Sequence, residues 1–526
     1  MNYQKPLRQF TIFLLLVSGI VLNSCTNESS NNVYSYTPTY SKNDCPMEIP
    51  DDVEVECGTL TTPEARTITN NDREVKLAVA VISKHSDTGS DDPVLYLSGG
   101  PGGVSLEDID FYIDLFSDTL ENRDLILLDQ RGNGYSTPNL QCPEVDDITL
   151  SLHQSGASFD LINQESDNAL LDCRDRLITE DINLEAYNVK ENIADINDLR
   201  KILNISEWNI YGISYGTLIA QALLANYPES IRSITLDSVV HSEDFYPNLN
   251  SVITFQEKLS SLFTLCESQE YCNTQHPNLQ QRFWDEFDRL NSTPVDIPFI
   301  SEEYAINRTI DFSGYDLLGF ARYILEFSFS IYAFPQLIDE VLHADYSRPL
   351  TIIENNLFFE NFSVGTLFST ACSQATFDTS ALQRLQELDV DQVFIDLELS
   401  QFFYMSEFCN DWGFDPTNKL AITDFTDSTP VLVLAGEYDI RTSSAEAFVV
   451  SNIIPNTFFA EIPNIGHGVL RDSCASQISK NFIAEPSATP DTSCIDEGED
   501  LVLQKPNQQI YKDVIPSVPW SAWPRR

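Results

Sequence analysis

A serine between two glycines is the residue best suited to nucleophilic chemistry in this sequence. Ser214 lies in the pentapeptide GISYG at 212–216, directly after the apolar run at 208–211 and before an amphipathic stretch. This order predicts a sharp turn from a strand into a helix, which exposes the hydroxyl above a sheet. The positive end of the helix dipole then lies beneath the hydroxyl. The alternative is a structural turn without chemistry.

A glycine-rich loop follows a second apolar run. The segment SGGPGG at 98–103 comes directly after VLYL at 94–97. Backbone N–H groups in such a loop can point at one spot, and an acyl oxyanion needs two donors at about 3 Å. We assign the N–H groups of Gly100 and Tyr215 to that role. A phosphate-binding loop is the alternative, but the Lys-Ser/Thr ending of a P-loop and the spacing of a dinucleotide fingerprint are missing.

Two loops near the C-terminus supply an acid and a base. Asp439 follows the apolar run VLVLA at 431–435, and His467 lies between two glycines. A histidine can take the serine proton and return it, while a carboxylate fixes the histidine tautomer and stabilises the imidazolium. The order Ser214, Asp439, His467 along the chain is the order of α/β hydrolases.

Alternatives exist for both residues. Glu437 is a second candidate for the acid, and Asp439 could instead cap a helix predicted over 443–450. His467 could be an ordinary loop histidine. Among the six histidines, His467 alone is flanked by glycines after a C-terminal apolar run.

The elements that must position these residues alternate between strands and helices. Continuous apolar runs of four or five residues that end at Gly or Asp are typical of buried parallel strands. Helical spacing of apolar residues fills the intervals between them. We therefore expect an α/β fold with a mostly parallel sheet. The predicted strands lie at 75–84, 94–97, 125–129, 208–211, 234–237 and 431–435, and helices at 190–203 and 214–227.

One long segment has a different pattern. Residues 241–420 contain aromatic-rich helical stretches at 320–334 and 382–405 and few clean strands. We expect a largely helical cap inserted between strands. The hydrolase core would then consist of residues 45–240 and 421–500, followed by a tail at 501–526.

The N-terminus has the pattern of an export signal. Lys5 and Arg8 precede an apolar run at 10–22, which is too short to cross a hydrocarbon core of roughly 30 Å. The run ends in LNSC at 22–25, which resembles the lipobox of bacterial lipoproteins. We expect a signal peptide at 1–25, lipidation of Cys25, and a flexible tether at 26–44. An ordinary signal peptide with a chance cysteine is the alternative.

Charge and cysteine content narrow the class of protein. The 526 residues include 80 acidic and 30 basic side chains, a formal net charge of −50, which argues against binding to nucleic acid or anionic lipid headgroups. Ten cysteines besides Cys25 form five couples close in sequence, which in an exported chain indicates disulfides in sequence order. CxxC and HxxxH patterns are missing, so we expect no metal and no cofactor. The expected pairs are Cys45–Cys57, Cys142–Cys173, Cys266–Cys272, Cys372–Cys409 and Cys474–Cys494.

Together these motifs resemble the α/β-hydrolase serine peptidases of the prolyl aminopeptidase and tripeptidyl aminopeptidase group, including their TAP-like C-terminal region. The resemblance implies a triad of Ser214, Asp439 and His467, a cap over the site, and peptide substrates with a free N-terminus. The matching stretches are CGTLTTPEAR (57–66), GGPGG (99–103), LLDQRGNGYS (127–136), DINDLRKILNISEWNIYGISYGT (195–217), YPESIRSITLDSVV (227–240), PVLVLAGEYD (430–439) and IPNIGHG (462–468).

Two positions depart from that group. Prolyl aminopeptidases usually begin the glycine-rich loop with His, where this chain has Ser98. The acid loop of the group often continues with Thr-Pro, where this chain has IRTS at 440–443. Both differences argue against strict proline specificity. The length, the export signal and the cysteines are more similar to the secreted tripeptidyl type.

The residues that would bind the substrate are less defined. An aminopeptidase must hold an α-ammonium group, so the cap should supply carboxylates, but each candidate could equally be a solvated surface charge. Aromatic residues could line a pocket or form the core of the cap. We expect Asp129 and Arg131 to be structural, with Arg131 pairing beneath the glycine-rich loop. The candidate carboxylates are Glu302, Glu303, Glu354 and Glu360, and the aromatic candidates are Phe320, Phe327, Phe358 and Phe359.

The sequence therefore predicts an exported serine exopeptidase that acts through an acyl-enzyme. A carboxylic-ester hydrolase with the same machinery is the alternative. A non-catalytic binding protein with a hydrolase fold is a third hypothesis, which the intact set of Ser214, Asp439 and His467 disfavours.

Overall fold

The computed structural model describes the chain from Tyr36 onward, with gaps. The expected signal peptide, Cys25 and the first part of the expected tether lie outside the described residues, as do Phe327, Phe359 and Glu360. The described residues are 36–66, 73–86, 88–242, 248–326, 331–358, 362–375, 387, 390–413, 419–423, 425, 428–496 and 501–503.

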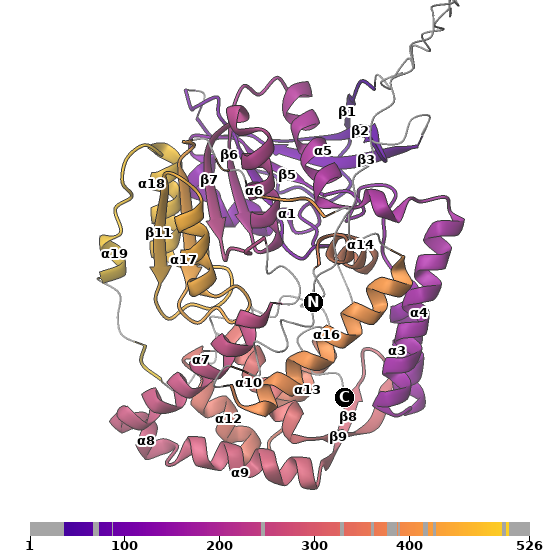
Figure 1. Cartoon of the computed structure of the whole chain (residues 1–526), viewed down its shortest axis with the longest axis vertical. Coiled ribbons are helices and arrows are strands. Elements are labelled where there is room, and N and C mark those ends of the chain that lie inside the picture. Colours follow the sequence, from indigo (N-terminus) through magenta and orange to yellow (C-terminus); the bar gives the residue numbers. More distant parts are fainter. Residues whose placement is uncertain are drawn as a thin grey trace, which may run out of the picture. The chain divides into compact units, whose positions relative to one another are not determined.

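A mixed sheet, in the upper part of the view, lies between layers of helices (Figure 1). Within the described residues it has nine strands in the order β1-β2-β3-β5-β4-β6-β7-β10-β11. β1, β2 and β3 are antiparallel to their neighbours, and β5, β4, β6, β7, β10 and β11 are parallel. The predicted α/β fold with a mostly parallel sheet is confirmed. The strands are β1 (Thr39–Asn43), β2 (Val55–Pro63), β3 (Glu74–Ile82), β4 (Val94–Leu97), β5 (Leu125–Leu128), β6 (Trp208–Ile213), β7 (Ile231–Asp237), β10 (Val431–Gly436) and β11 (Thr457–Ile462).

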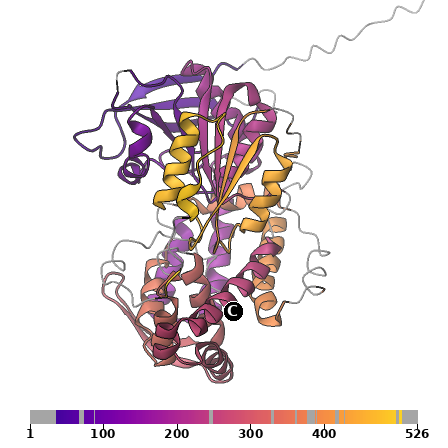
Figure 2. The same ribbon diagram turned by 90° about the vertical axis from the view of Figure 1, so that its left-hand side faces the viewer.

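Helices cover both faces of this sheet because its central strands are apolar on both sides (Figure 2). Side chains alternate between the faces, so Val433 belongs to the largest core cluster and Leu434 to another. The first face packs against α5 (Val189–Ile202), α6 (Tyr215–Asn226) and α17 (Ser444–Ile453). The second face packs against α1 (Ile109–Leu115), α2 (Ser117–Leu120) and α18 (Ser473–Ala484).

Between β7 and β10 the chain leaves the sheet and forms a mostly helical cap. A hairpin of β8 (Val295–Ser301) and β9 (Ile306–Phe312) interrupts the helices. The helices are α7 (Leu249–Ser268), α8 (Glu270–Gln275), α9 (Leu279–Ser292), α10 (Gly314–Glu326), α12 (Phe334–Leu342), α13 (Ser347–Asn355), α14 (Val364–Gln374) and α16 (Gln392–Trp412).

Packing crosses the boundaries expected from sequence in both directions. Most cap side chains up to Leu397 share one apolar cluster, but the side chains of α14 and the C-terminal part of α16 join the core of the sheet. Conversely, α3 (Pro143–Ser155), followed by α4 (Phe159–Thr179), contacts the hairpin of the cap, where Arg308 lies 3.2 Å from His153. Amphipathic helices bury their apolar face wherever a complementary surface lies, which the order of segments does not reveal.

Part of the expected tether is ordered. Residues 39–43 form β1, which pairs antiparallel with β2 from Thr39↔Thr61 to Asn43↔Cys57. Most of its side chains are exposed, so backbone hydrogen bonds hold the strand in place. For the same reason its sequence has no apolar pattern from which the strand could be predicted.

The ten cysteines of the described residues pair in sequence order. The bonds are Cys45–Cys57, Cys142–Cys173, Cys266–Cys272, Cys372–Cys409 and Cys474–Cys494. The last of them joins α18 to α19 (Ser493–Asp496). In the described ranges, no helix combines the length and the apolar character needed to cross a membrane.

Candidate active site

Ser214 lies at the turn from β6 into α6 in a strained conformation. Its φ is 54° and its ψ is −123°, a region that residues other than glycine rarely adopt. The Ser214 N–H donates to the carbonyl of Asp237 at 3.0 Å. A Cβ on Gly212 would lie 2.5 Å from the carbonyl oxygen of Gly216, and one on Gly216 would lie 2.1 Å from that of Leu97. The turn therefore requires both glycines.

Asp439 and His467 are hydrogen-bonded to each other. Nδ1 of His467 lies 3.0 Å from Oδ2 and 3.2 Å from Oδ1 of Asp439, whose side chain is fully buried. The carboxylate also accepts hydrogen bonds from the N–H and hydroxyl of Thr442, both at 2.8 Å, and from the N–H of Arg441 at 2.9 Å. Burial alone would raise the pKa of Asp439, but His467 and the bonds from Thr442 outweigh it and hold the pKa below its usual value.

The loops that carry the three residues follow strands at the carboxyl edge of the sheet. Asp237 at the end of β7 is in register with Ile213 of β6 and with Leu434 of β10, so the loops that follow these strands lie side by side. A Cβ on Gly468 would lie 3.1 Å from Cδ1 of Ile213. The residue after His467 is therefore in contact with the residue before Ser214.

The structure tests the two alternatives to Asp439 as the acid: Glu437 in its place, or a helix-capping role for Asp439. The carboxylate of Glu437 accepts the N–H of Asn464 at 3.0 Å. The N-cap of α17 is Ser443, which forms a capping box with Glu446, so Asp439 does not cap that helix.

The glycine-rich loop lies against the nucleophile elbow. A Cβ on Gly99 would lie 3.0 Å from the Cβ of Ser214, and Gly100 has a φ of 118°. Asp129 holds the following residues, because its Oδ1 accepts the N–H groups of Ser105 at 2.8 Å and Leu106 at 3.1 Å. On the other side of Ser214, Tyr215 begins α6, and the first N–H groups of a helix have no acceptor within it. Gly100 follows Gly99, which lies against Ser214, and Tyr215 follows Ser214 itself. The two residues predicted to donate to the oxyanion are thus each one position from a residue at the elbow.

Arg131 is buried, and the partners of its guanidinium lie outside the glycine-rich loop itself. Its guanidinium forms two bonds of 2.8 Å to Asp195 of α5 and donates to the carbonyls of Glu64 at 2.7 Å and Ala186 at 2.6 Å. The neighbouring Gln130 does bond to the loop, where its amide donates to the carbonyl of Ser98 at 3.3 Å.

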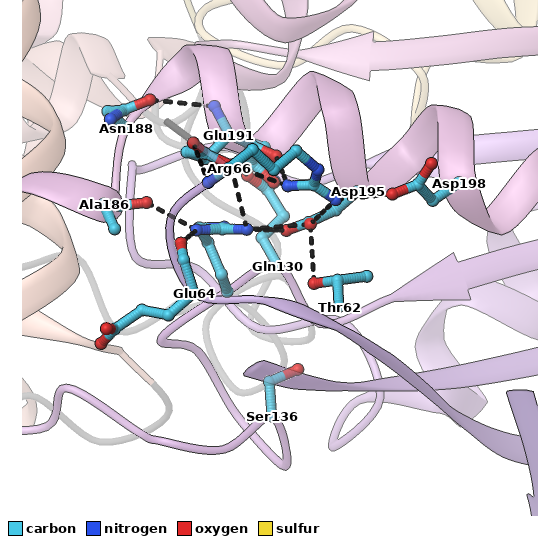
Figure 3. Close-up of polar contacts among 12 residues, drawn as sticks. Thr62, Glu64, Arg66, Gln130, Ser136, Ala186, Asn188, Glu191, Asp195 and Asp198 are labelled. Carbon is cyan, nitrogen blue, oxygen red and sulfur yellow. Dashed lines mark hydrogen bonds and ion pairs between the residues drawn. The ribbon is translucent and has the colours of Figure 1, made fainter. Parts of the chain in front are cut away.

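Arg66 completes this buried network. It bonds to Glu191, Asp195 and Asp198, each at 2.7 Å (Figure 3). Burial would raise the pKa of Asp195, but Arg131 and Arg66 outweigh it and lower the pKa below its usual value. The network ties together segments that are far apart in sequence.

Of the four carboxylates proposed for the substrate ammonium, Glu302, Glu303 and Glu354 are described, and none of these three bonds to Ser214, Asp439 or His467. Glu302 and Glu303 are exposed in the turn between β8 and β9, and Glu354 is half-buried in α13. Among the aromatic candidates, Phe320 is buried in the cap core, and the ring of Phe358 packs on Tyr304 at 4.7 Å between centroids.

Glu326 at the end of α10 is a site-adjacent residue that the sequence reasoning missed. It is 1% exposed, and its carbonyl accepts the N–H of His467 at 3.3 Å. Its carboxylate pairs with Arg441 at 3.0 Å and Arg322 at 3.4 Å. An acidic residue at the end of a mostly apolar helix, four positions after an arginine, was the signal in the sequence.

A groove of about 1140 Å³ lies beside these loops. Glu437, Tyr438 and Asn464 line it together with α7, whereas the described lining does not include Ser214 or His467. In the described part of the chain, no group of three or more His, Cys, Asp or Glu side chains could hold a metal ion.

Comparison with known proteins identifies the family of the chain. Residues 92–472 match the model of the alpha/beta hydrolase fold, so the chain belongs to the α/β-hydrolase family. The predicted α/β-hydrolase fold is confirmed. Curated relatives then narrow the group.

YuaR of Escherichia coli, which is named a hydrolase, is 27% identical over 285 residues, 51% of this chain and 53% of YuaR. Proline iminopeptidase of Arabidopsis thaliana is 26% identical over 28% of this chain and 26% of its own length. Tripeptidyl aminopeptidase of Streptomyces coelicolor is 24% identical over 38% of this chain and 39% of its own length. The matched region thus spans about half the length of these relatives or less. The resemblance to the prolyl and tripeptidyl aminopeptidase group is confirmed.

Proposed function

We propose that the chain is a serine exopeptidase that releases short peptides or single residues from the N-terminus of its substrate. Ser214 attacks the scissile carbonyl, and His467 takes the serine proton and returns it to the leaving amine. Asp439 orients His467, and the N–H groups of Gly100 and Tyr215 hold the oxyanion. One observation carries the proposal: a buried carboxylate with a lowered pKa is bonded to Nδ1 of His467 at the edge where Ser214 has its strained turn.

The names of the relatives support a peptide substrate. Proline iminopeptidase and tripeptidyl aminopeptidase both act at free N-termini by name. A substrate ammonium would need a carboxylate of the cap, and Glu326 is the buried one beside the histidine loop. Because Arg322 and Arg441 already compensate its charge, the ammonium must share the carboxylate with them.

That compensation also favours a second candidate function. A carboxylic-ester hydrolase needs the same nucleophile, base and oxyanion donors but no ammonium site. If Glu326 stays committed to its two arginines, acyl esters without a free amine become the better substrates.

We further propose that the protein is exported and that Cys25 anchors it to a membrane through lipid. The five disulfides support an oxidising compartment. Membrane fractionation of the wild-type chain and a Cys25→Ser variant tests the anchor, since only the wild type should require detergent for release.

The decisive test compares three substrates on the full chain. They are a tripeptide anilide with a free N-terminus, the same anilide acetylated, and a simple acyl ester, each assayed also with Ser214→Ala. Cleavage confined to the free tripeptide supports the aminopeptidase. Ester turnover without anilide cleavage would move the protein to the esterases, and full activity of Ser214→Ala would refute the nucleophile.

A further inference from the structure

A second buried carboxylate, Asp237, lies between the nucleophile elbow and the histidine loop. Asp237 ends β7 and is 0% exposed. Its carbonyl accepts the N–H of Ser214 at 3.0 Å, and its carboxylate accepts the hydroxyl of Tyr211 at 2.6 Å. The same carboxylate accepts the N–H groups of Val469 at 2.9 Å and Leu470 at 3.2 Å.

Ser238, the next residue, binds one more amide of the histidine loop. It has a φ of 55°, and its own N–H donates to the carbonyl of Leu434 in β10 at 3.0 Å. Its hydroxyl accepts the N–H of Gly468 at 2.8 Å. Asp237 and Ser238 together therefore bind the three consecutive amides that follow His467.

These bonds matter because the histidine loop has no regular structure of its own. Residues 463–472 connect β11 to α18, so their buried N–H groups need acceptors from elsewhere in the fold. For residues 468–470 the acceptors are Asp237 at the end of β7 and Ser238 directly after it, and Asp237 also binds the N–H of Ser214. A shift of the loop along β7 would move the imidazole relative to the serine.

We propose that Asp237 is a positioning residue of the reaction, which fixes His467 against Ser214 by holding the nucleophile elbow and the histidine loop on one strand end. The proposal rests on the triad of the proposed function. Asp237 does not replace Asp439, since its carboxylate is committed to Tyr211 and the two amides while Asp439 contacts Nδ1 of His467. Burial raises the pKa of Asp237, whereas the pKa of Asp439 is lowered, which separates the two carboxylates.

The test uses Asp237→Asn in the full chain, with Asp92→Asn as the matched control. Asp92 also accepts side-chain hydrogen bonds, from Arg123 at 3.0 Å and Asn209 at 2.8 Å, but it precedes β4 at the opposite edge of the sheet. Because a misplacement of about 1 Å can cost about 10²-fold in rate, we expect Asp237→Asn to lower kcat about 10²-fold with KM within about twofold. Asp92→Asn should keep kcat after correction for the folded fraction.

A readout that does not need turnover accompanies the kinetics. The proton NMR signal of the His467–Asp439 hydrogen bond, assigned by its loss in His467→Gln, should shift or broaden in Asp237→Asn and stay unchanged in Asp92→Asn. If Asp237→Asn unfolds, Ser238→Ala gives the same comparison with a smaller effect. An Asp237→Asn enzyme with wild-type kcat and an unchanged signal would overturn the inference while Ser214→Ala stays inactive. Hydrolysis that survives Ser214→Ala would instead refute the proposed function, and the positioning role would fall with it.

Discussion

The core and the cap hold their buried charges in different ways. In the core, Arg131 and Asp195 belong to a network whose members lie within or beside the motifs shared with the peptidase group. In the cap, the buried carboxylate of Glu326 forms an ion pair with Arg441, which lies in the loop of Asp439 and belongs to the core. This ion pair therefore crosses the junction between cap and core. A network that is complete within the core stabilises the scaffold, whereas an ion pair across the junction couples the cap to the residues that we propose as catalytic.

The largest expected effect distinguishes Asp439 from Glu437, the two acidic residues of the loop that follows β10. Asp439→Asn should lower kcat by about 10⁴-fold, because the amide favours the wrong tautomer of His467. The matched control is Glu437→Gln, two residues away, which should stay within about threefold of the wild type because it contacts Asn464 and not His467. Steady-state kinetics of both variants with the best substrate decide the assignment. Equal losses in the two variants would contradict it.

The sequence revealed the core far better than the cap, for physical reasons. Strands β6 and β10 are buried, mostly apolar runs that end at or near a glycine, and Ser214 and Asp439 follow within three residues of them. β9 was missed because Arg308 occupies one of its inward positions and breaks the apolar alternation. Glu326 and Asp237 were missed because their roles arise from contacts with a loop more than a hundred residues away.

The core network gives the next largest effect, on stability. Asp195→Asn leaves Arg131 and Arg66 without their shared carboxylate, so we expect the free energy of unfolding at pH 7 to fall by about 3–5 kcal/mol. The folded-state pKa of Asp195 is lowered, so its stabilisation is present above about pH 4 and is lost as the pH falls through the lowered value. The gap between variant and wild type should therefore shrink on acidification.

Urea unfolding at pH 7 and pH 3 measures this gap. The control is Asp118→Asn in the exposed pair with Lys480, which should cost less than about 1 kcal/mol. A gap for Asp195→Asn that is equally small would show that the network does not stabilise the core.

The contact between α3 and the cap hairpin gives a smaller effect with its own pH dependence. Burial first, and then the charge of Arg308, lower the pKa of His153 to about 4. In the unfolded chain His153 therefore binds a proton near pH 6.5, whereas in the folded chain it stays neutral down to about pH 4. The stability of the fold consequently falls as the pH drops from 6.5 towards 4. The loss amounts to at most about 3 kcal/mol, at 1.36 kcal/mol for each pKa unit.

His153→Gln should remove this part of the acid destabilisation. His343→Gln is the control, because His343 is exposed on the cap surface. Thermal melts of the three proteins between pH 7 and pH 4.5 check the prediction. Parallel pH curves for wild type and His153→Gln would contradict it.

The smallest expected effect decides what the cap does at the site. Glu326→Gln keeps the carbonyl that accepts the N–H of His467 but removes the charge between Arg322 and Arg441. If the carboxylate also receives a substrate ammonium, kcat/KM should fall about tenfold for the free tripeptide anilide, as loss of one charged hydrogen bond implies. The acetylated anilide and the ester should change much less, since neither carries the ammonium.

Glu354→Gln in α13 is the matched control for a cap carboxylate that is not held by these arginines. If kcat/KM of Glu326→Gln fell equally for all three substrates, Glu326 would support the loop of Asp439 through Arg441 and would not bind the substrate ammonium. The cap would then act on the catalytic loops alone, and the case for an aminopeptidase would have to come from another residue. A loss confined to the free amine would instead make the ion pair across the junction the point where substrate recognition and the proposed catalytic loops meet.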